Sequence, residues 1–220
     1  MDPAPRLFSI GHSNHDFAHF LRLLQGAGIT AVADVRSSPF SQRLPQFNRP
    51  ELERTLGEQD IGYAFLGDLL GGRPRRADVY DAEGRVDYER VRAAAWFHRG
   101  LDRLVQAMED FTIAMLCAEE DPLNCHRGLL ITPALVERGI HPLHLRGDGS
   151  VETTAALEDR LLKKHFRKEI ENVLFPLSAE ERRHLLVEAY RRQTRARAYR
   201  PRSGDPAELP PGGEGIEFDL

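Results

Sequence analysis

The chain has 220 residues, of which 41% are hydrophobic and 29% charged, and its formal net charge is −4. These values fit a globular protein and exclude a collagen-like or low-complexity chain. The slight negative charge gives no overall basic field that would attract nucleic acid, although local basic patches are compatible with it.

Short apolar segments alternate with amphipathic ones along the first 150 residues. The first strand is expected at Leu7–Ile10, followed by a helix that begins near Phe17 and is ended by Gly26 and Gly28. Ser13 or Asn14 is expected to cap this helix. Further strands are expected at residues 29–35, 61–66, 111–117 and 140–145, and further helices at 51–59, 86–109 and 129–136. Pro133 indicates either a kink in the last of these helices or a short helix, and long loops are expected at 39–50 and 67–85.

Strands that alternate with helices predict an α/β fold, a three-layer sandwich with a mainly parallel, Rossmann-like sheet and helices on both faces. In such sheets ligands bind at the edge where the strands end. Several polar residues fall at or just after predicted strand ends, namely His12, Asp34, Arg36, Asp68, Cys117 and Glu119. The topology should therefore gather residues from distant parts of the chain on one rim.

The sequence changes in character after Gly149. Charged helices are expected at residues 153–166 and 179–198, and six arginines without an acidic residue lie between Tyr190 and Arg202. We expect an α/β domain at residues 1–150, a helical extension at 151–200 that packs on it, and a disordered tail at 201–220.

The compartment is predicted from what the sequence lacks. No apolar run approaches membrane-spanning length, and residues 1–6 lack the apolar core of a secretory signal. We therefore expect a soluble, cytoplasmic protein that does not associate with membranes. In a reducing cytosol the two cysteines would be thiols, metal ligands or a redox pair.

The strongest candidate for chemistry is the segment from Cys117 to Arg127, which joins a buried strand to a helix. The free N–H groups and positive dipole at a helix start stabilise a thiolate, as would His126 and Arg127, so Cys125 is a candidate nucleophile. Packing alone is the competing interpretation for both cysteines. A third is a zinc or iron site formed by Cys117, Cys125, His126 and His12, although the cysteine spacing is not that of a zinc finger.

Other residues near the predicted strand ends indicate an anion site. Arg36 suits phosphate or carboxylate, unless it only forms a buried ion pair with Asp34. His12 could act as acid, base or ligand. The predicted anion-binding residues are Arg36, Ser37, Arg43, Asn48, Arg73, His126 and Arg127. Arg75 and Arg76 lie beside Arg73 on the 67–85 loop. No Walker loop, G-x-G-x-x-G or G-x-S-x-G motif is present to specify the ligand.

Five motifs in order resemble the DUF488 family, over roughly Leu7 to Gly149. They are Gly11-His12-Ser13, Asp34-Val35-Arg36-Ser37, Pro45-Gln46-Phe47-Asn48, Leu70-Gly71-Gly72 and Cys117-Ala118-Glu119 with Cys125-His126-Arg127. Gly128 stands where the family often has serine. The family is a domain of unknown function whose members are loosely labelled DNA-repair-like, so the resemblance implies a fold and a pocket. The Asp-Val-Arg element also looks like the opening of rhodanese domains, an analogy only.

Three hypotheses about function remain open at this point. The first is a cysteine-dependent transferase or hydrolase for an anionic, nucleotide-like substrate, with Cys125 as nucleophile and Glu119, His12 and Asp34 in catalytic roles. The second is a metal-dependent enzyme that uses the same cluster, with zinc or iron. The third is a non-catalytic module that binds nucleic acid through the arginines of residues 190–202. The sequence leaves the oligomeric state open.

Overall fold

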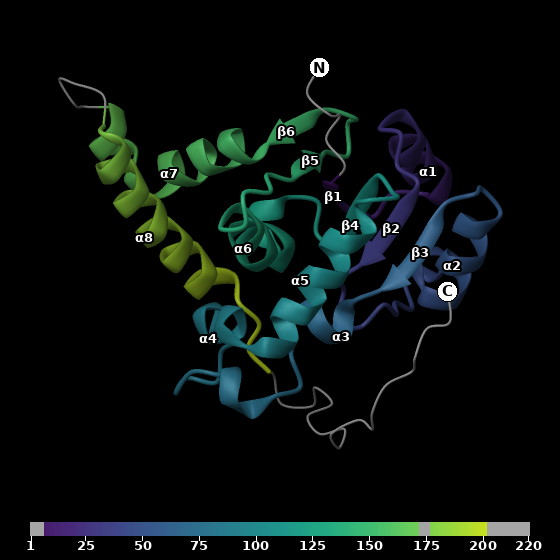
Figure 1. The fold of residues 1–220 in the computed structure, drawn as a ribbon, viewed down its shortest axis with the longest axis horizontal. Coiled ribbons are helices and arrows are strands. Elements are labelled where there is room, and N and C mark those ends of the chain that lie inside the picture. Colours follow the sequence, from purple (N-terminus) through teal and green to yellow (C-terminus); the bar gives the residue numbers. More distant parts are fainter. Residues whose placement is uncertain (1–6, 172–176, 202–220) are drawn as a thin grey trace.

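The computed structural model describes residues 7–171 and 177–201 and contains one six-stranded sheet (Figure 1). Its strands lie in the order β3-β2-β4-β1-β5-β6, and all neighbours are parallel except β5 and β6. The strands are β1 (Leu7–Gly11), β2 (Ala31–Asp34), β3 (Gly62–Phe65), β4 (Ile113–Cys117), β5 (Leu143–Leu145) and β6 (Val151–Thr153). The predicted mainly parallel sheet is confirmed.

Helices cover both faces of the sheet, because successive side chains of a strand point to opposite sides. In β4, Ile113 and Met115 join one apolar cluster, and Ala114 and Leu116 join another. The first cluster includes side chains of α5 (Ala95–Ala107), α6 (Thr132–Val136) and α7 (Thr154–Glu171). The second is closed by α1 (Phe17–Gly26) and α2 (Arg49–Gly57). The fold is a three-layer α/β sandwich, as predicted.

The single helix predicted at 86–109 is two helices in the structure. It is divided into α4 (Tyr88–Ala93) and α5 by the extended backbone of Ala94, whose ψ is 132°. The predicted loop at 67–85 contains α3 (Gly67–Leu70) and the 3-10 helix η2 (Ala77–Val79). Both differences arise because short turns lack the length that makes a hydrophobic period visible.

The predicted cap of α1 is also wrong. Asp16 is the N-cap, and its side chain accepts the N–H of His19. Ser13 instead adopts a positive φ of 46° and bonds Asn14 with its hydroxyl. The C-terminal prediction is confirmed, since α1 ends at Gly26 and Gly28 follows with a φ of 67°.

A π-helix, η4 (Arg127–Ile131), precedes α6 where a single helix was expected. The N–H of Thr132 reaches back to the carbonyl of Arg127, five residues earlier. Pro133 lies in the first turn of α6, which has only five residues, so the short helix is the alternative that the structure shows. Single π turns often occur at functional sites, and this one directly follows Cys125 and His126.

The C-terminal part contains one strand that the sequence did not reveal. β6 has only three residues and pairs antiparallel with β5. α7 is longer than predicted and changes direction at Phe166 (φ −138°, ψ 35°). α8 (Ala179–Arg197) begins with a capping box between Ser178 and Glu181.

The chain beyond α8 returns to the rest of the molecule. The carbonyl of Tyr199 accepts the N–H of Val86 at 2.9 Å, so the end of α8 lies beside the segment before α4 (Figure 1). Of the predicted tail at 201–220, everything after Pro201 lies outside the described residues. None of the described helices combines the length and apolarity needed to cross a membrane.

Candidate functional site

The carboxyl ends of β1, β2 and β4 meet at a cavity of about 610 Å³. These three strands are adjacent in the centre of the sheet, with β4 in the middle. The predicted site residues that line the cavity are His12, Arg36, Ser37, Arg73, Cys117, Glu119, Cys125 and His126. The topology therefore brings together residues that are up to 114 positions apart, from His12 to His126.

Two thiols and an imidazole form the floor of this cavity. Cys117 ends β4, and Cys125 follows the 3-10 helix η3 (Pro122–Asn124); both are buried free cysteines. The Nδ1 atom of His126 lies 3.6 Å from Sγ of Cys117 and 3.7 Å from Sγ of Cys125. The three donor atoms lie within 4.8 Å of one another and could hold a metal ion. His12, predicted as a fourth ligand, lines the cavity but is not part of this group.

The ring of His126 is fixed in orientation. Its Nε2 atom donates to the carbonyl of Val35 at 2.9 Å, which leaves Nδ1 toward the two sulfurs. Gly72 packs against the imidazole ring, where a Cβ atom on this residue would lie 2.7 Å from Cγ of His126. A glycine is therefore required for the 70–73 loop to cover the ring.

Arg127 supplies a buried positive charge beneath the thiols. Its guanidinium donates to the carbonyls of Glu119 (2.5 Å) and Glu120 (2.6 Å), and only 1% of the residue is exposed. Among the described residues no carboxylate pairs with it. Its backbone N–H points to Sγ of Cys125 at 3.4 Å. Arg127 does not line the cavity, so it organises the loop rather than contacting a ligand as predicted.

The two thiols differ in acidity as a consequence. Burial opposes ionisation of Cys125, but the hydrogen bond from Cys117 and the charges of Arg127 and His126 hold its pKa well below the ordinary value. Burial and the neighbouring Cys125 raise the pKa of Cys117, whose sulfur also lies 3.2 Å from a carboxylate oxygen of Glu119. These opposite directions favour Cys125 over Cys117 as the thiolate of the pair.

Asp34 and Arg36 form the buried ion pair that the sequence left as the alternative. Both carboxylate oxygens of Asp34 accept from Arg36, at 2.9 and 2.6 Å, and one also accepts the hydroxyl of Tyr63. Asp34 is fully buried and does not line the cavity. Its place in the structure is that of a positioning residue for Arg36, which does border the cavity.

His12 lines the cavity, and its ring is held by its own surroundings. Its ring stacks on Phe47 with centroids 4.4 Å apart, and Nδ1 donates to the carbonyl of Ser13 at 2.8 Å. Burial, together with the charge of Arg36, lowers the pKa of His12 to about 4. The lowered pKa favours the neutral imidazole at pH 7.

Several predicted contributors lie away from the cavity. Arg43 and Asp68 are exposed and do not line it. The side chain of Asn48 accepts the N–H of Ser41 and thereby shapes the 39–50 loop. Arg76 stacks on Trp96 at 5.3 Å. Of the long-loop arginines, only Arg73 reaches the cavity.

Several residues of the cavity wall were not among the predicted site residues, and they include Tyr88, Asn124, Arg197 and Tyr199. Arg197 and Tyr199 come from the end of α8 and the residues after it. The guanidinium of Arg73 stacks on the ring of Tyr199 at 4.7 Å and so joins the 70–73 loop to the C-terminal segment. The arginine run marked this segment as unusual, but no sequence pattern told which face of the protein it would reach.

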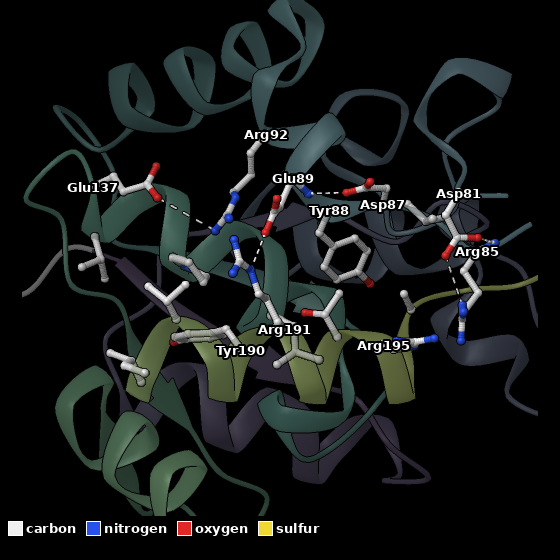
Figure 2. A pocket seen from close by; sticks show the side chains of 18 of the residues that line it. Asp81, Arg85, Asp87, Tyr88, Glu89, Arg92, Glu137, Tyr190, Arg191 and Arg195 are labelled. Carbon is white, nitrogen blue, oxygen red and sulfur yellow. Dashed lines mark hydrogen bonds and ion pairs between the residues drawn. The ribbon is translucent and has the colours of Figure 1, made fainter. Parts of the chain in front are cut away.

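A second, larger cavity of about 770 Å³ lies between α4, α6 and α8 (Figure 2). Figure 2 shows charged side chains of both signs around it, and Tyr88 pointing into it from α4. Arg191 pairs with Glu89 at 2.9 Å, and Arg85 pairs with Asp81 at 3.2 Å. Tyr88 also lines the smaller cavity and forms part of the wall between the two.

Comparison with known proteins assigns the chain to one family. The model of the domain of unknown function DUF488 matches residues 16–132, and the chain belongs to this family. No curated protein and no solved structure matches it. The matched region contains Cys117, Cys125 and His126, whereas Arg197 and Tyr199 lie outside it. At Gly128 a Cβ atom would lie 2.3 Å from the carbonyl oxygen of Pro122, so this chain has no room for a serine there.

Proposed function

We propose that the protein is a cysteine-dependent enzyme that acts on a small anionic substrate, with Cys125 as the nucleophile. The observation that carries this proposal is the placement of the Cys125 sulfur. It borders the cavity, faces His126 and the N–H of Arg127, and lies above a buried guanidinium that has no carboxylate partner among the described residues. This surrounding favours negative charge on sulfur, which is the reactive form of cysteine.

A two-step group transfer fits the residues around the sulfur. The sulfur forms a bond to an electrophilic atom of the substrate, and the bond from that atom to the leaving group breaks with its electron pair. Glu119 lines the cavity and can protonate the leaving group. Water or an acceptor then attacks the same atom and gives its proton to the carboxylate of Glu119, which restores the acid, and the bond to sulfur breaks with its pair returning to Cys125.

The anionic substrate is proposed from the charges of the cavity wall. Arg36, Arg73 and Arg197 line it, and among the described residues Glu119 is the one acidic residue that does. Arg36 is neutralised by Asp34, whereas no ion pair of Arg73 or Arg197 is found within the described residues. Guanidinium groups match carboxylate and phosphate oxygens, and 610 Å³ is a volume typical of sites for small molecules or nucleotides.

The nucleic-acid-binding hypothesis draws less support. Arg191 and Arg192 of the arginine run are paired with Glu89 and Glu188, which reduces their availability for phosphates.

Two reduced thiols at a working site would suit the reducing compartment predicted from the sequence.

Alkylation of the thiols tests the proposal. Limited reaction of the native protein with iodoacetamide, followed by peptide mapping, should label Cys125 before Cys117. Cys117→Ser should still be labelled, and Cys125→Ser should react much more slowly while its circular dichroism spectrum stays native. Faster labelling of Cys117, or equal labelling of both variants, would remove Cys125 from the role of nucleophile.

A further inference from the structure

We infer that Cys117, Cys125 and His126 bind a transition-metal ion of the zinc class at the floor of the cavity. The inference deepens the proposed function, and rests on it only in that both use Cys125. Metal coordination is a recognised way to keep a nucleophilic thiol in its thiolate form.

The distances between the donor atoms fit a tetrahedral ion. With Zn–S near 2.3 Å and Zn–N near 2.0 Å, a sulfur and a nitrogen on one tetrahedral edge lie about 3.5 Å apart. The observed distances from Nδ1 of His126 to the two sulfurs are 3.6 and 3.7 Å. Both edges thus agree with the expected value to within about 0.2 Å, and the two sulfurs lie within 4.8 Å of each other.

The surroundings of His126 also resemble those of a metal ligand. A metal-bound imidazole usually donates its other N–H to a carbonyl or carboxylate, which fixes the ring and its tautomer. Here Nε2 donates to the carbonyl of Val35, and Gly72 packs on the ring, so Nδ1 is held toward the sulfurs. A thiol pair that only packed in the core would not require an imidazole oriented in this way.

The ligand set indicates which ion would bind and how. Two sulfurs and one imidazole nitrogen are soft to borderline ligands that suit zinc better than magnesium or calcium. All three residues line the cavity, so a fourth coordination position remains for water, a substrate atom or the nearby carboxylate of Glu119. Catalytic zinc sites keep such an open position, whereas structural sites fill it with a fourth protein ligand.

Cobalt binding tests the inference on the full-length chain without a histidine tag. Titration with Co²⁺ alone should give a sulfur-to-cobalt charge-transfer band that saturates at about one ion per chain, and Zn²⁺ should abolish it. Cys117→Ser, Cys125→Ser and His126→Gln should each weaken cobalt binding by more than about 100-fold, beyond the usual cost of losing an outer partner. His12→Gln is the matched control, because His12 lines the same cavity outside the triad, and it should bind cobalt as wild type does.

The possible failures are distinguishable. Absence of the charge-transfer band, or a band that survives in Cys125→Ser, overturns the metal site. If Cys125 is nevertheless alkylated before Cys117, the proposed function stands without a metal. If cobalt binds through the triad and Cys125 resists alkylation both with and without a chelator, the metal site stands and the nucleophile does not.

Discussion

The two cavities of the molecule differ in how their charges are satisfied more than in size. Of the five arginines that line the larger one, three pair with carboxylates among the described residues (Figure 2): Arg191 with Glu89, Arg85 with Asp81 and Arg92 with Glu137. Around the smaller one, Arg73 and Arg197 have no ion pair within the described residues, and a buried guanidinium lies under two thiols.

This difference shows why the smaller cavity is the better candidate for chemistry. Paired surface charges hold α4 and α8 in register but leave little potential for a ligand. Charges without a partner, together with buried groups whose protonation is shifted, mark places where a site is built for a reaction or a ligand. The larger volume, about 770 Å³ against 610 Å³, does not change this ranking.

The largest expected effect is on the free energy of unfolding, to which a buried arginine should contribute much more than an exposed one. Arg127→Met should lower the free energy of unfolding by about 3–5 kcal/mol, because two carbonyls, each worth roughly 1–3 kcal/mol, lose their donor in the interior. Arg191→Met, which breaks an exposed pair at the larger cavity, should cost far less. Urea denaturation of both variants measures the contrast. Equal losses would mean that Arg127 does not organise the loop around the thiols.

The stability of the protein should also depend on pH, through a histidine in the sheet beside the smaller cavity. His144 of β5 is fully buried against Ser9, and burial, with the charges of Arg127 and Arg146, lowers its pKa to about 3. Since the unfolded state binds a proton near pH 6.5, the stability contributed by neutral His144 is complete above that pH and declines as the pH falls toward 3.

His144→Asn tests this directly. At about 1.4 kcal/mol per pH unit, wild type should lose up to about 2 kcal/mol more than the variant between pH 6.5 and pH 5. Urea denaturation at several pH values gives the two curves. A difference that stays constant with pH would show that His144 does not titrate on unfolding in this range.

The sequence predicted those parts of the site that follow from periodicity. Buried strands end where an apolar run ends, so His12 and Cys117 could be placed at one edge of a parallel sheet. Cys125 could be placed at a helix start because the run after it is apolar. What the pattern could not give is the pairing of side chains. Asp34 and Arg36 had two interpretations, and only coordinates show that each neutralises the other.

The C-terminal contribution was beyond sequence reasoning for a different reason. Arg197 and Tyr199 reach the cavity only because α7 turns at Phe166 and α8 runs back toward α4. That path depends on packing between elements far apart in the chain, which no local propensity encodes. β6 was not predicted because it is too short: three residues with Glu152 in the middle show no recognisable alternation of apolar and polar side chains.

The smallest expected effect concerns the charge at the mouth of the smaller cavity. With a chelator present, Cys125 should react faster with anionic iodoacetate than its acidity alone predicts, because Arg73 and Arg197 raise the local concentration of anions. The ratio of the iodoacetate rate to the iodoacetamide rate isolates this effect, since the neutral reagent reports the intrinsic reactivity of the sulfur.

Arg197→Gln should lower this ratio by about threefold at low salt, and Arg73→Gln by a similar factor, with the differences shrinking as salt screens the charges. Arg195→Gln is the matched control: it removes the same charge two residues earlier on α8, but its side chain lines the larger cavity. An unchanged ratio in Arg195→Gln places the attraction at the mouth of the smaller cavity. If all three variants lower the ratio equally, the anion preference belongs to the general charge of the surface, and the C-terminal segment has no special part in recognising the substrate.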